Sequence, residues 1–175
     1  MQGFRQRLQR AVSCISSAVI VSGTVEARGA GDVGYFGLSE NPLWLPGTDG
    51  LGLSLDLTYR IQQLADTRRS WTVSESSYYY ALLDRSEHEV LAYHWHPHVE
   101  GVSYPHLHIS PGAVRGDVVE RAGLSEQANA LRADLTTAHL PTGPAALESV
   151  LWLAIAQLGA APLRSDWRRL LPAPD

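Results

Sequence analysis

The chain has no lysine, and all fourteen of its basic residues are arginine. We interpret this as the codon usage of a GC-rich bacterial genome rather than as a device for binding phosphate. With a net charge of −4 and a pI near 5.9, the sequence also lacks the excess of positive charge that drives tight binding to DNA. We therefore do not expect the protein to bind DNA through electrostatic contacts with the phosphate backbone.

Cysteine is scarce as well, since Cys14 is the only one in 175 residues. An internal disulfide framework is excluded, and a reducing cytoplasm is the expected location. No apolar run reaches the length of a membrane span, so no membrane association is expected. Arg5, Arg7 and Arg10 precede an apolar stretch, as in a secretory signal. The helical spacing of its apolar residues, and the serines that interrupt it, favour an amphipathic helix instead.

The composition, with 45% hydrophobic and 18% charged residues, is that of a globular protein. We expect a single domain over 1–175, because this length can bury a substantial core. Residues 1–50 would form a helix and a Gly/Pro-rich extension, 51–110 an antiparallel sheet, and 111–175 a helical part. This order predicts an α+β fold, an antiparallel β-meander of about four strands covered by N- and C-terminal helices.

Apolar residues recur at period two or cluster with β-prone residues in four segments, 51–61, 70–83, 90–96 and 104–110, which predict the strands. Helices are expected at 4–17, at 124–138, from a cap at 142 or 143 to Gly159, and from Ser165 onwards.

Histidines are concentrated in the segment 93–110, which holds five of the seven in the chain. Because side chains alternate along a strand, His94 and His96 share one face of their strand, and His106 and His108 share one face of the next. Pairing that buries the intervening large apolar residues places all four imidazoles together on the opposite face. We expect His96 opposite His106 and His94 opposite His108.

The strand before this hairpin adds further polar groups to the same face. A turn around 84–89 places Tyr79 beside His94, with Ser77 and Glu75 further along. The expected site is therefore a polar face of the sheet that is lined by imidazoles and one phenol.

Acid–base catalysis is the first hypothesis for this face, because imidazole exchanges protons near neutral pH. Two imidazoles several ångströms apart can act as base and acid across a phosphodiester, and this needs no cofactor. Arg60 or Arg115 would hold a phosphate, and a tyrosine would donate to a developing oxyanion. The catalytic candidates are His94, His96, His106, His108 and Tyr79.

A metal site is the alternative hypothesis for the same face. Two His-x-His pairs on adjacent strands can converge on zinc or another divalent transition metal. The ligands would then be His94, His96, His106 and His108. The segment "HWHPHVE" contains part of a cupin ligand motif, but the glycine spacing that accompanies that motif is absent.

Other features receive simpler interpretations. His88, in a predicted turn, and His139, before "LPTG", are interpreted as bystanders. Cys14 is expected to be buried, and Trp44 to anchor a loop. A third hypothesis is a non-enzymatic binding or assembly protein, in which the aromatic loop 35–46 and the C-terminal apolar helix serve an interface, and which can form an oligomer.

The order "YYYALL…VLAYHWHP…YPHLHI", followed by an apolar helix, resembles small prokaryotic toxins of the TumE type over about residues 70–160. Pro97, His98, Pro105, His106 and His108 carry the resemblance. Tyr93–His96 replaces the charged pair of that family, and the histidine spacing in the last strand differs. The resemblance implies the toxin of a toxin–antitoxin pair, with a cognate antitoxin protein as partner and RNA as substrate.

Overall fold

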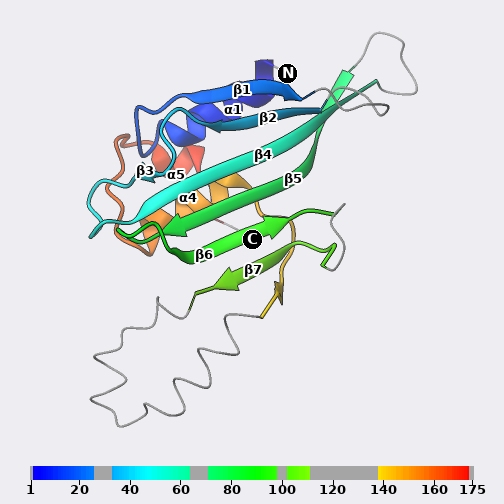
Figure 1. The fold of residues 1–175 in the computed structure, drawn as a ribbon. Coiled ribbons are helices and arrows are strands. Elements are labelled where there is room, and N and C mark those ends of the chain that lie inside the picture. The colour runs from blue at the N-terminus through cyan, green and yellow to red at the C-terminus, as the bar shows by residue number, and fades with distance from the viewer. Residues whose placement is uncertain (1, 26–32, 64–70, 98–101, 111–137, 174–175) are drawn as a thin grey trace.

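The computed structural model describes residues 2–25, 33–63, 71–97, 102–110 and 138–173 of the chain. In these parts, eight strands form one sheet, and three helices lie against one of its faces (Figure 1). An α+β fold with an antiparallel sheet and helices from both ends of the chain is therefore confirmed. The predicted number of about four strands is wrong.

The sheet is antiparallel throughout, in the order β1-β2-β4-β5-β6-β7-β8, with β3 paired to β4. The predicted strands correspond to the four in its middle, β4 to β7. The strand bounds are β1 Ile20–Val25, β2 Val33–Leu38, β3 Leu43–Trp44, β4 Gly52–Gln63, β5 Trp71–Leu83, β6 Glu89–Trp95, β7 His106–Ile109 and β8 Leu140–Pro141.

Strand β2 comes from a glycine-rich region that was expected to form a loop. Gly34 of β2 lies opposite Tyr59 of β4, and a Cβ atom at position 34 would collide with the tyrosine ring. That ring is held in place, because it is buried and stacks on Phe36 with 4.5 Å between ring centroids. The glycine therefore makes room for an aromatic side chain instead of marking a turn, which is why composition alone missed this strand.

The three described helices are α1 Gln2–Val12, α4 Leu147–Ala156 and α5 Trp167–Leu170. Helix α4 begins later than predicted, since its N-cap is Ala146, which has no side-chain hydrogen bond. The Tyr78 hydroxyl of β5 instead accepts a hydrogen bond of 2.8 Å from the backbone N–H of Ala145. Gly159 has a φ of 80° and follows α4, as expected of a glycine that ends a helix. Residues 124–137 of the helix predicted at 124–138 lie outside the described residues.

The core fills the space between the helices and one face of the sheet. The apolar residues that alternate along β4, Leu53, Leu55 and Leu57, are almost fully buried there. Cys14 is fully buried, as expected. Trp44 is 46% exposed and so lies outside the core, whereas its neighbours Leu43 and Leu45 are buried. The interface role of the loop 35–46 stays a prediction.

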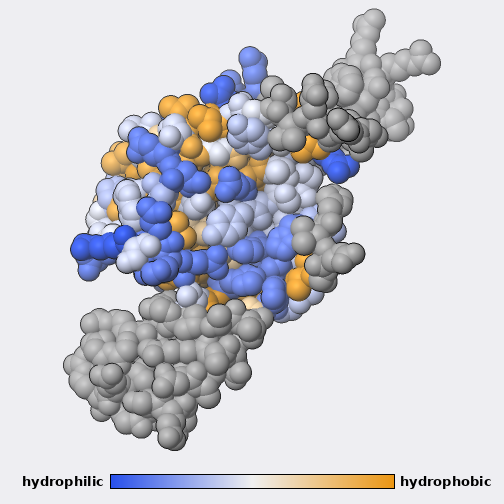
Figure 2. Space-filling model, in the orientation of Figure 1, coloured by the Kyte–Doolittle hydropathy of each residue, from blue (hydrophilic) through white to orange (hydrophobic). Residues whose placement is uncertain are grey.

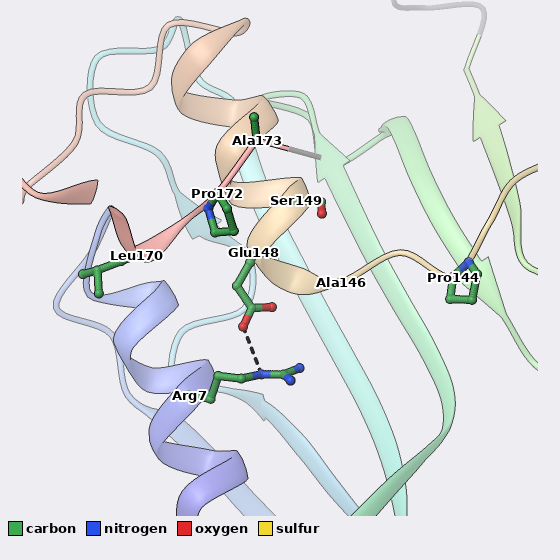
Figure 3. A pocket seen from close by; sticks show the side chains of 8 residues that line it. All are labelled: Arg7, Pro144, Ala146, Glu148, Ser149, Leu170, Pro172 and Ala173. Carbon is green, nitrogen blue, oxygen red and sulfur yellow. Dashed lines mark ion pairs between the residues drawn. The ribbon is translucent and has the colours of Figure 1, made fainter. Parts of the chain in front are cut away.

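A polar contact also joins the helices on this side. The Nε atom of Arg7 on α1 lies 3.0 Å from Oε1 of Glu148 on α4, beside a pocket of about 580 Å³ (Figure 3). A second carboxylate, from Glu75 of β5, lies 3.7 Å from the same guanidinium. The arginine therefore bridges the two layers.

The other face of the sheet is not covered by the described helices. Figure 2 shows hydrophilic side chains gathered on this face, over the strands in the middle and lower part of the sheet. This is the face on which the candidate site lies.

Candidate functional site

Strands β6 and β7 bring the four predicted histidines to the uncovered face. The apolar residues between them pair on the core side, Tyr93 with Leu107 and Leu91 with Ile109. The histidines lie on the opposite face from these apolar residues, as predicted, but the predicted register is wrong by two residues. His94 lies opposite His106, and Ala92 lies opposite His108. A shift of two residues keeps every side chain on its face, so the sequence pattern does not distinguish the two registers.

Three of these imidazoles form a compact triangle. The ring centroids of His94 and His108 are 4.6 Å apart, those of His106 and His108 are 5.0 Å apart, and those of His94 and His106 are 5.5 Å apart. One ring nitrogen from each residue lies within 4.8 Å of the other two. We call this set the histidine triad.

The Nε2 atoms of the triad, His94, His106 and His108, are buried and have no hydrogen-bond partner among the described residues. Leaving a buried polar atom unsatisfied costs about 1–3 kcal/mol. Three such atoms in one place are therefore unusual in a face that serves only as a surface. A shared ligand for the three nitrogens would remove this cost.

Burial also affects the proton occupancy of the triad. Burial lowers the pKa of His106 and of His108 below the usual value of 6.5, and the neighbouring imidazoles lower both further. His106, with 0% of its surface exposed, is the most buried of the set. Both rings are therefore neutral at neutral pH, which is the form in which imidazole binds a metal or accepts a proton.

Tyr79 of β5 lies beside His94, as predicted, with the ring edges in contact at a centroid distance of 4.8 Å. Its hydroxyl donates a hydrogen bond of 3.1 Å to Oε2 of Glu89, at the start of β6. Burial and the Glu89 charge raise the pKa of Tyr79 to about 12. Tyr79 is thus a weak acid, already engaged with a carboxylate, which disfavours its predicted role as an oxyanion donor.

Glu89 is a site residue that the sequence analysis missed. Its Oε2 atom lies 3.8 Å from Nε2 of His94. The neighbouring imidazole of His94 and the hydroxyl of Tyr79 lower the pKa of Glu89, so this side chain is a carboxylate at neutral pH. By simple alternation, residue 89 would share the core face with Leu91. The pairing shifts between Leu82 and Leu83 of β5, and this irregularity turns Glu89 to the histidine face instead.

Two further histidines flank the triad. The ring of His96 lies 5.3 Å from that of His106 and 5.9 Å from that of His94. The ring of His139, just before β8, lies 4.6 Å from that of His108 and 5.0 Å from that of His106. The interpretation of His139 as a bystander is therefore wrong. Its place depends on the pairing of β7 with β8, which is separated from β7 by about thirty residues and has no local sequence signal.

The remaining predicted residues lie elsewhere. His88 is exposed in the turn before β6, with Nδ1 3.7 Å from Asp84, and does not join the cluster. Arg60 lies opposite Ser74, five residues along β5 from Tyr79, so it lies farther along the sheet and does not join the histidine cluster. His98 and Arg115 lie outside the described residues.

Glu75 is not on the histidine face, where it was predicted. The pairing of β4 with β5 skips Ser76, since Thr58 pairs with Ser77 and Tyr59 pairs with Glu75. This β-bulge turns the Glu75 side chain toward the helices, where it meets Arg7.

Comparisons with known proteins add no family. No protein-family model matches the chain, and neither a curated protein nor a solved structure is similar enough to count as a match. Among the described residues, no helix is long and apolar enough to cross a membrane. The function must therefore be argued from the site itself.

Proposed function

We propose that this protein binds a divalent transition-metal ion of the zinc class through Nε2 of His94, His106 and His108. One observation carries the proposal: one ring nitrogen from each of these residues lies within 4.8 Å of the other two, and the Nε2 atoms of all three are buried without a hydrogen-bond partner among the described residues. A metal ion would satisfy all three lone pairs at once.

The orientation of His106 supports this proposal. Nδ1 of His106 lies 2.9 Å from the carbonyl oxygen of Tyr104, so Nδ1 carries the proton and donates it to that oxygen. The unprotonated nitrogen is then Nε2, which belongs to the unpaired set. Histidines that bind metals commonly donate their other ring N–H to a carbonyl or carboxylate in this way, which fixes the ring.

The donor set points to the class of ion. Three imidazoles suit zinc, copper, nickel and iron, whereas calcium and magnesium prefer oxygen ligands. In tetrahedral zinc with bonds of 2.0–2.1 Å, ligand atoms are separated by about 3.4 Å. Binding therefore requires the imidazoles to approach one another by an amount of the order of an ångström, which small rotations of the side chains allow.

Metal analysis of tag-free protein tests the proposal. We expect about one equivalent of zinc, or of a competing divalent transition metal, in the wild-type protein, and loss of this stoichiometry in each of His94→Ala, His106→Ala and His108→Ala. His88→Ala is the matched control, because it removes an exposed imidazole outside the cluster. A His106→Ala protein that is folded and still holds one equivalent with unchanged affinity would contradict the proposal.

We propose as a second candidate the metal-independent function, acid–base cleavage of RNA by a bacterial toxin that acts in the cytoplasm and is neutralised by a cognate antitoxin. The observation in its favour is that neutral His106 and His108, which can accept a proton, lie beside two further imidazoles, His96 and His139. On this hypothesis, expression of the wild-type chain inhibits growth, and RNA cleavage persists in EDTA. His96→Ala and His106→Ala then relieve the inhibition while the fold is retained. Fully toxic variants, or no cleavage in EDTA, would exclude it.

A further inference from the structure

The three histidines of the proposed metal site fill three of the four positions around a tetrahedral ion, so one further ligand is needed. The Nε2 atoms of the triad have almost no exposed surface. An ion bound between them would therefore be largely surrounded by the three imidazoles. Enclosed zinc sites usually take all four ligands from the protein, whereas catalytic zinc keeps one position for water or substrate.

Glu89 is the carboxylate that points at this position. Its Oε2 atom lies 3.8 Å from Nε2 of His94, which is buried and has no hydrogen-bond partner among the described residues. Two ligands of one ion with bonds near 2.1 Å are separated by at most about 4.2 Å. The carboxylate oxygen and the imidazole nitrogen of His94 already satisfy this limit. The carboxylate would have to turn toward His106 and His108, because Glu89 is not among the groups whose ligand atoms all lie within 4.8 Å of one another.

The surroundings hold this carboxylate in place. The Tyr79 hydroxyl donates to Oε2 of Glu89, and the Tyr79 ring packs against the imidazole of His94. Beneath them, Ala81 of β5 and Ala92 of β6 face each other and are fully buried. Because alanine is small, this pair leaves space on the histidine face that the side chains of Tyr79, Glu89 and His94 can occupy.

We infer that Glu89 is the fourth ligand of the metal, and that Tyr79 is a positioning residue that holds the Glu89 carboxylate toward the ion. This inference rests on the proposed metal site of the histidine triad. It assigns a closed site with three nitrogen ligands and one oxygen ligand. The bound ion would then stabilise the strands β6 and β7 rather than activate a water molecule.

His139 is the competing fourth ligand, because its ring lies 4.6 Å from that of His108. Two observations favour Glu89. His139 is exposed, whereas the Glu89 side chain is partly buried, with 31% of its surface exposed. Glu89 also approaches Nε2 of His94 directly.

Substitution of cobalt for zinc tests the inference in the full chain. We expect Co²⁺-loaded wild-type protein to show the intense visible bands of four-coordinate cobalt, and added azide to leave them unchanged, because no position is open. In Glu89→Gln, we expect the Kd for zinc to increase about 10–100-fold, the cobalt bands to change, and azide to shift them. In Tyr79→Phe, we expect a smaller loss of affinity and cobalt bands like those of the wild type.

Glu87→Gln is the matched control, since Glu87 is exposed in the same turn, two residues from Glu89, and should have no effect. Should Glu89→Gln fail to fold, the azide experiment on the wild type still decides. An azide-sensitive wild-type spectrum, or zinc affinity and cobalt bands unchanged in Glu89→Gln, would overturn the inference. So would a change of the cobalt bands in His139→Ala but not in Glu89→Gln. If wild-type protein binds no zinc or cobalt at all, the proposed metal site itself fails, which is a different outcome.

Discussion

The carbonyl oxygen of Tyr104 accepts a hydrogen bond of 2.9 Å from Nδ1 of His106, the most buried histidine of the cluster. Tyr104 immediately precedes Pro105, so the contact comes from the chain segment that leads directly into β7. The backbone itself therefore orients this imidazole, whatever side chain stands at position 104. With Nδ1 engaged in this way, Nε2 of His106 is left to face His94 and His108.

Zinc should stabilise the folded protein measurably. A ligand that binds only the native state, at a free concentration of 100 times its Kd, adds about 2.7 kcal/mol to the free energy of unfolding. For a chain of this size, this corresponds to an increase of about 5–10 °C in Tm, measured by circular dichroism or calorimetry. The increase should disappear with excess EDTA and in His106→Ala. A Tm that zinc does not change would count against native-state binding.

The flanking histidines should matter less than the triad. His96 and His139 contact triad rings but do not belong to the set whose nitrogens converge. We expect His96→Ala and His139→Ala to weaken zinc binding by about tenfold each, because they pack against ligands. Triad variants should lose measurable binding, and competition titration with a chelating dye would rank all five. Equal losses in every variant would mean that the triad is wrongly defined.

The faces of the strands could be predicted from the sequence because alternation is a strong constraint. Tyr93 and Leu107 must be buried, so His94, His106 and His108 had to lie on the other side. The register could not be predicted, since a shift of two residues satisfies the same constraint. The pairing of β7 with β8, which brings His139 to the cluster, could not be predicted either, because the two strands are far apart in the sequence.

Two irregular pairings account for the remaining errors, and they act in opposite directions. The bulge at Ser76 removes Glu75 from the histidine face, and the shift next to Leu83 adds Glu89 to it. Each irregularity switches the face of the sheet on which the following residues of the strand lie. Simple alternation therefore assigns those residues to the wrong face. Glu89 therefore lies on the histidine face in place of the predicted Glu75. The cause is backbone geometry that cannot be predicted from the residue types.

Glu75 should give the protein a pH-dependent stability. Burial raises its pKa above the usual 4.5, although the Arg7 guanidinium lowers it, and Glu148, Tyr78 and Tyr80 lie nearby. Above pH 4.5 the folded state thus holds a proton that the unfolded state has released, so this group's contribution to stability falls as pH rises through the folded pKa. We expect Glu75→Gln to gain stability relative to the wild type over that interval, measured by urea unfolding from pH 4.5 upward. A difference that does not vary with pH would contradict this.

Gly34 should be intolerant of any side chain although its backbone is ordinary extended strand. A methyl group there would collide with the ring of Tyr59, which cannot move aside because it is buried and stacked on Phe36. We expect Gly34→Ala to lower the free energy of unfolding by about 1–3 kcal/mol, the usual cost of overpacking a core. Gly143→Ala is the matched control, since a Cβ atom there meets nothing within 4 Å. Urea unfolding of both variants would decide: equal stabilities would mean that the aromatic ring can be displaced, and that the glycine of β2 has no packing role.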